Sequence, residues 1–110
     1  MNQTVVDVGA EFSRYPAGRF PNDGKFNGET FRCKYLTPPL KAGHKLLIKL
    51  DGAVDYGSSF LEEAFGGLVR VENFTPSALR KSIVFYTVNH PFVPDEIWSY
   101  IDDEGTKDRS

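Results

Sequence analysis

Two adjacent serines, Ser58 and Ser59, are the residues of this sequence best placed for chemistry. They follow an apolar run and a glycine-containing turn and precede an amphipathic segment, so we expect them at the start of a helix. The first amides of a helix lack partners and the helix dipole is positive there, which favours a phosphate group. Ser59 and Glu62 also have the S-x-x-E spacing of a capping box, in which the hydroxyl would only cap the helix.

The other residue types that could catalyse a reaction lack the required spacing. His44 and His90 are the only histidines, and neither lies in a metal-binding or nucleophile-activating pattern. The glycines and serines of residues 52–59 lack the lysine of a phosphate-binding P-loop. The single Cys33 cannot form an internal disulfide, and we place it on the apolar side of a helix as a core thiol. We therefore expect a protein that is not an enzyme and that uses no metal or cofactor.

Length and charge exclude several classes of protein. A chain of 110 residues forms one domain and can bury a core without disulfides or metals. The formal net charge of −2 argues against a nucleic-acid-binding protein, which needs an excess of Lys and Arg. No apolar run is long enough to span a bilayer, and the N-terminus does not read as a signal peptide. We therefore expect a cytoplasmic protein without membrane or nucleic-acid partners.

A strand and a helix flank the two serines. Alternation in residues 45–50 predicts a strand, with Leu46, Ile48 and Leu50 on one face. Apolar residues at helical spacing predict a helix from Ser59 to about residue 70. We expect the paired Gly66 and Gly67 to mark a close approach to the sheet or an early helix end.

The rest of the chain alternates between strands and helices. A β-branched run predicts a first strand at residues 4–8, and the Asp23-Gly24 turn favours a short hairpin in an irregular segment, residues 15–28. The further expected elements are continuation of the first strand through residues 9–12, a helix at 29–36 capped by Asn27 and stopped by Thr37-Pro38-Pro39, a short helix from Thr75-Pro76 to about residue 81, a strand at 82–88 covered on both faces, and a helix at 94–103.

This order predicts an α/β layer fold with right-handed crossovers. We expect a single domain at residues 1–103, built on a mixed sheet of about four strands packed with helices. Residues 104–110 are polar and predict a flexible C-terminal tail.

Two segments resemble a known family. SSFLEEAFGGLVR at residues 58–70, after an aliphatic strand, is similar to the STAS-like family of unknown function, small bacterial domains related to sulfate-transporter and anti-sigma-antagonist modules. PAGRFPNDGKFNGETFR at residues 16–32 resembles the glycine-rich approach to the first helix of that family. The resemblance implies a compact α/β domain that binds a protein partner in regulation or signalling.

The resemblance also implies a site. In STAS anti-sigma antagonists a regulatory phosphoserine occupies the turn that Ser58 and Ser59 occupy here, and the partner is a histidine-kinase-like ATP-binding protein. In that family Asp directly precedes the serine and Gly soon follows, whereas here Tyr56 and Gly57 separate Asp55 from Ser58. The contact would involve the loop at residues 14–25 and the partner-binding candidates Asp55, Tyr56, Gly57, Phe60, Glu62 and Glu63.

Two other interpretations stay open. In one, the domain binds a small anion or nucleotide between the glycine-rich loop and the helix start, through Arg19, Arg32, Ser58 and Ser59. In the other, the domain forms a homodimer through a sheet edge.

Overall fold

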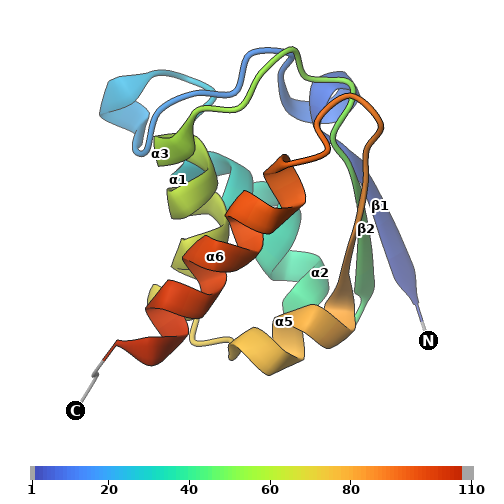
Figure 1. Ribbon diagram of the computed structural model, residues 1–110, viewed down its shortest axis with the longest axis vertical. Helices are drawn as coiled ribbons and strands as arrows, with labels where there is room; N and C mark the ends of the chain where they lie inside the picture. Colours follow the sequence, from blue (N-terminus) through green and yellow to red (C-terminus); the bar gives the residue numbers. More distant parts are fainter. Residues whose placement is uncertain (1, 108–110) are drawn as a thin grey trace.

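A parallel β-sheet lies along one side of the helices in the computed structural model, which describes residues 2–107 (Figure 1). The predicted α/β class is confirmed. The elements in chain order are β1 Gln3–Asp7, the π-helical turn η1 Val8–Phe12, the 3₁₀ turn η2 Pro21–Asp23, α1 Gly28–Phe31, the π-helical turn η3 Arg32–Leu36, α2 Thr37–Lys41, β2 Lys45–Lys49, α3 Ser58–Leu61, the π-helical turn η4 Glu62–Gly66, α4 Gly67–Arg70, α5 Pro76–Ser82, β3 Ile83–Tyr86 and α6 Val93–Thr106.

Within residues 2–107 the sheet has three strands in the order β1-β2-β3, and each pairs in parallel with its neighbour. The prediction of a mixed sheet of about four strands is therefore wrong. Residues 9–12 do not continue β1, because Asp7 accepts a hydrogen bond from the Ala10 amide at 3.1 Å and the chain turns into η1. Asp23 accepts bonds from the Arg19 and Phe20 amides, which closes the 3₁₀ turn η2 in place of a hairpin.

The direction in which the chain crosses the sheet leaves one face bare. Both crossovers, β1 to β2 and β2 to β3, move the same way across the sheet. Right-handed crossovers that move in one direction place their helices on the same face. In the described part of the chain α6 also packs on this side, against η4 and α4 (Figure 1). The prediction that the third strand is covered on both faces is therefore wrong, and Val84 and Tyr86 are exposed.

The first helix is longer than predicted. Asn27 caps it as expected, with its side-chain oxygen accepting from the Thr30 amide at 2.9 Å. Thr37-Pro38-Pro39 does not stop it, because the Thr37 amide bonds to the Arg32 carbonyl, which shifts the hydrogen-bond register at η3. The prolines then occupy the first turn of α2, where missing amides are tolerated. Cys33 lies on the exposed side, so its prediction as a core thiol is wrong.

The predicted second helix is confirmed as the run α3, η4 and α4, called here the central helix, residues 58–70. Its paired glycines neither touch the sheet nor end the helix. A Cβ on Gly67 would lie 2.1 Å from Nη1 of Arg32, so the glycine makes room for that guanidinium. Phe60, Ala64 and Phe65 are buried, as the helical spacing predicted.

The C-terminal elements form near their predicted positions. Thr75 caps α5 by accepting from the Ala78 amide at 3.1 Å. Ile97 and Ile101 of α6 are fully buried. The helix continues to Thr106 and Glu104 is buried, so the predicted boundary at residue 103 falls inside α6. Residues 108–110 of the predicted tail lie outside the described residues.

Candidate functional site

The loops after β2 and β3 are fixed to each other by Asp51. Its carboxylate accepts hydrogen bonds from the Thr87 hydroxyl, from the Val88 amide at 2.8 Å and from the Asn89 amide at 3.1 Å. The bond from Thr87, followed by those from the amides, lowers the pKa of Asp51. The Nε2 atom of His90 lies 2.9 Å from the Ala53 carbonyl and adds a second link. These bonds therefore link the two loops to each other.

The loop after η1 is linked to these two loops. The Arg14 carbonyl accepts a bond from the Val54 amide at 2.8 Å. The Tyr56 hydroxyl donates to the Leu50 carbonyl at 2.8 Å, and its ring packs edge-on against His90 at 5.3 Å. Burial raises the pKa of this buried tyrosine. Three loops at the carboxyl ends of the strands thus lie together at one end of the molecule (Figure 1).

Exposed side chains on these loops form what we call the carboxyl-edge surface. Large apolar residues are exposed there and are not covered by any other described residue. The surface is defined by Tyr15, Val54, Asp55, Gly57, Ser58, Ser59, Val88 and Phe92.

Both serines lie in the exposed first turn of the central helix. Gly57 is the cap residue, and no side chain caps this helix, so the predicted capping box between Ser59 and Glu62 is wrong. Two guanidinium groups, those of Arg19 and Arg70, bond to the Glu62 carboxylate instead. The Ser58 side chain lies near Tyr100 of α6, where it opposes the rise in the pKa of Tyr100 that the Glu96 carboxylate causes, so the two serines differ in their surroundings.

The predicted partner-binding residues divide by exposure. Asp55 and Gly57 are exposed on the carboxyl-edge surface, and Glu62 is half-buried beside it. Tyr56, Phe60 and Glu63 are buried and cannot touch a docked partner without rearrangement.

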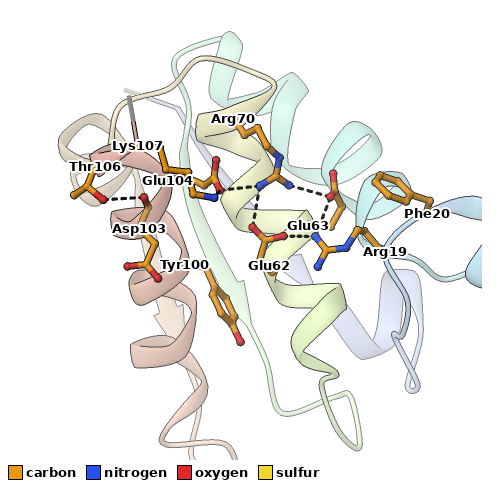
Figure 2. A pocket seen from close by; sticks show the side chains of 10 residues that line it. All are labelled: Arg19, Phe20, Glu62, Glu63, Arg70, Tyr100, Asp103, Glu104, Thr106 and Lys107. Carbon is orange, nitrogen blue, oxygen red and sulfur yellow. Dashed lines mark hydrogen bonds and ion pairs between the residues drawn. The ribbon is translucent and has the colours of Figure 1, made fainter. Parts of the chain in front are cut away.

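A charged pocket of about 660 Å³ lies between the central helix, α6 and the loop that carries Arg19 (Figure 2). Arg70 stands at its centre, with Nη1 2.9 Å from Glu62 and 3.0 Å from Glu104, and Nη2 2.9 Å from Glu63. Burial opposes ionisation of Glu62, but hydrogen bonds from Arg70 and Arg19 outweigh it and lower the pKa of that carboxyl. The pocket therefore holds ionised groups that neutralise one another.

Arg32 lies deeper than the pocket. Its Nη1 donates to the Glu63 carbonyl at 2.6 Å and to Glu63 Oε2 at 2.7 Å, and its Nε donates to Glu72 at 3.3 Å. It packs against Gly67, which at about 1.5 Å per residue lies roughly 13 Å along the helix from Ser58. The structure thus places Arg32 away from Ser58, and both Arg19 and Arg32 are already bonded to carboxylates.

Comparison with known proteins assigns the chain to a family. Residues 27–91 match the model of a family described as a STAS-like domain of unknown function. The chain belongs to this STAS-like family. The match includes both serines and the loop that Asp51 fixes, whereas Arg19 and α6 lie outside it. No curated protein and no solved structure matches the chain.

Several residues around the site of this STAS-like domain escaped the sequence analysis. Tyr100 and Glu104 meet the central helix only because α6 docks on it, so no local spacing could have identified them. Arg70 lies on the central helix itself, about two turns after Glu62 and Glu63, the glutamates to which it bonds. Residues 2–107 contain no group of three His, Cys, Asp or Glu side chains that could hold a metal ion. Within the same residues no helix has the length and apolar character needed to cross a membrane.

Proposed function

We propose that this STAS-like domain is a non-enzymatic regulatory module that binds a histidine-kinase-like ATP-binding protein through the carboxyl-edge surface. One observation carries the proposal: Ser58 and Ser59 are exposed at a helix start, beside exposed apolar side chains on loops that are fixed to one another. Membership of the STAS-like family supports it, because related anti-sigma antagonists act by docking such proteins.

The chemistry of the carboxyl-edge surface suits a protein partner. Tyr15 and Phe92 present aromatic area to solvent, a residue class that is enriched in protein interfaces, and Val54 adds aliphatic area. The Asp51 and His90 bonds hold the loops in place before binding, so little conformational entropy would be lost on docking.

Phosphorylation of either serine would switch this docking. A phosphate adds about −1.5 to −2 charges near neutral pH and would interrupt an apolar contact. On Ser58 it would also place negative charge near Tyr100, whose hydroxyl donates to the Glu96 carboxylate at 2.6 Å. Ser59 has no such influence on Tyr100, so a phosphate there would act through the partner.

Isothermal titration calorimetry with a purified histidine-kinase-like ATP-binding protein from the same organism tests the proposal. Val54→Asp should weaken binding at least tenfold because it places a charge in the contact. Val71→Asp is a matched control, because Val54 and Val71 are both 51% exposed and Val71 lies outside the carboxyl-edge surface.

Two results would count against the proposal in different ways. If no complex forms, or if both aspartate variants bind equally well, docking through this surface is wrong. If Val54→Asp weakens binding but Ser58→Asp and Ser59→Asp do not, the surface stands and the phosphorylation switch is removed.

A further inference from the structure

The face of the sheet opposite the helices has the composition of a binding surface. Val5, Leu47 and Val84 pair across the three strands in one register row and point away from the helices. Val5 is 46% and Val84 is 59% exposed, and Tyr86, on the same face, is 57% exposed. Parallel sheets are normally covered on both faces, so an apolar row on an open parallel face indicates a missing layer.

Unpaired positive charge surrounds this row. Lys45 and Lys49 lie on the same face of β2, two residues before and after Leu47, and both are exposed. Neither forms an ion pair with a carboxylate of residues 2–107, although the whole chain has a net charge of −2. Asp7 is paired with Lys49 in the register and its side chain accepts the Ala10 amide, so the outward face of the strands carries two lysines against this one carboxylate. The open face therefore complements an acidic partner.

The lysines argue against a second copy of the chain as the missing layer. In a face-to-face dimer whose two-fold axis runs along β2, Lys49 meets Lys49 of the other copy. With the axis across the strands, Lys49 meets Lys45 of the other copy. Either arrangement brings like charges together around Leu47, which is unfavourable.

The dimensions of the face match one helix. Neighbouring strands lie about 4.8 Å apart, so β1 and β3 are roughly 10 Å apart, close to the diameter of a helix with its side chains. Lys45 and Lys49 are separated by about 13 Å at roughly 3.3 Å per strand residue, which corresponds to roughly two helical turns.

We propose that this open face binds one amphipathic helix of a partner protein, with the pattern acidic-x-x-apolar-apolar-x-x-acidic. The two apolar residues cover the row formed by Val5, Leu47 and Val84, one on each side of Leu47. The two acidic residues, about two turns apart, pair with Lys45 and Lys49. This face is separate from the carboxyl-edge surface, so the inference does not depend on the proposed function.

A stapled 16-residue helical peptide carrying E-x-x-L-L-x-x-E is the probe, with the K-x-x-L-L-x-x-K peptide as its charge-reversed counterpart. NMR titration of the labelled domain should give saturable shift changes at Val5, Leu47 and Val84. The double variant Lys45→Glu/Lys49→Glu should weaken binding of the acidic peptide at least tenfold and should bind the basic peptide. Lys25→Glu/Lys34→Glu, an equal change of charge at exposed lysines elsewhere, should leave the affinity unchanged.

The proposal is overturned if the acidic peptide gives no saturable shifts up to about 1 mM, or if the shifts map to another surface. Equal binding of both peptides would overturn the charge assignment. Light scattering could instead show a concentration-dependent dimer that Val84→Asp dissociates. That result would mean that the open face binds a second copy of the chain and not a partner helix. The ¹⁵N spectrum of each variant shows whether the fold is retained.

Discussion

Arg32 and Glu63 form a buried ion pair between the first helix and the central helix. Arg32 Nη1 lies 2.7 Å from Glu63 Oε2, and both side chains are only 3% exposed. The same guanidinium also donates to the Glu63 carbonyl and to the Glu72 carboxylate. It therefore links the first helix both to the central helix and to the loop after it. The position of the central helix, and hence of the serines at its start, depends on this contact.

Replacing Arg32 tests that dependence. Arg32→Met should lower the free energy of unfolding by about 1–3 kcal/mol, because it removes the buried bonds to the Glu63 carbonyl and carboxylate while Arg70 stays paired with that carboxylate. Lys41→Met is the control, since Lys41 pairs with Glu72 at 3.5 Å but is 61% exposed. Lys41→Met should lower the free energy of unfolding by less than about 1 kcal/mol. Urea unfolding measures both, and equal losses would contradict the assigned role of Arg32.

The two helical glycines should respond differently to alanine. Alanine normally stabilises a helix interior by about 1 kcal/mol relative to glycine. Gly67→Ala should instead destabilise, because its Cβ would lie 2.1 Å from the buried Arg32. At Gly66 the Cβ would meet only the tip of Glu62 at 2.7 Å, which can move.

A double-mutant cycle separates the causes. In the Arg32→Met background the penalty of Gly67→Ala should shrink, as measured by chemical unfolding. An unchanged penalty would mean that the glycine is needed for another reason.

Stability should fall in acid partly through Asp51. Its pKa is lowered in the folded state, so its contribution is present above the pKa of an unfolded aspartate, about 3.9, and is lost as pH falls through the folded-state pKa. The Asp51→Asn variant should therefore have a lower melting temperature than the natural protein near pH 7. This difference in melting temperature should become smaller as the pH falls. Thermal unfolding from pH 7 to pH 2 measures this, with the exposed Asp103→Asn as control. A pH-independent difference would contradict it.

The phosphate-mimicking variants should fold. A negative charge in the first turn of a helix stabilises it by about 0.3–1 kcal/mol, so Ser59→Asp should be at least as stable as the natural protein. Ser58→Asp should be less stable than Ser59→Asp, because its carboxylate would lie near Tyr100 and the Glu96 carboxylate to which Tyr100 donates, and like charges repel. Melting temperatures measure the order, and Ser59→Lys should reverse the sign of the charge effect. If Ser59→Asp unfolded, loss of partner binding by that variant would have no regulatory meaning.

Cys33 should react in the folded state. Its side chain is exposed, so an aromatic disulfide reagent should modify it in one phase without denaturant. Absorbance of the released thiolate measures the rate. A requirement for denaturant would restore the core position that the sequence suggested.

Local signals in the sequence predicted the elements well. The caps at Asn27 and Thr75 formed as expected, because each depends on residues only three positions away. Helical spacing also identified the buried face of the central helix. The prediction that the prolines end the first helix was wrong, because a π-helical turn before Pro38 places them in the first turn of α2. Composition alone does not reveal such a turn.

Features that depend on contacts between distant parts of the chain could not be predicted from the sequence. The capping box at Ser59 failed because Arg19 and Arg70 reach Glu62 from outside the first turn. Coverage of β3 on both faces failed because it depends on the winding direction of the chain, to which apolar content gives no guide. The exposure of both serines agrees with their expected place at a helix start, whereas the burial of Phe60 and Glu63 depended on packing.

The bonds that hold Asp51 come from residues 36 to 38 positions later in the chain. During synthesis, therefore, a nascent polypeptide cannot assemble the loops around the two serines until its third strand has left the ribosome. A chain that ends before Thr87 would lack these bonds, so a partner that docks at this end of the molecule should bind it more weakly.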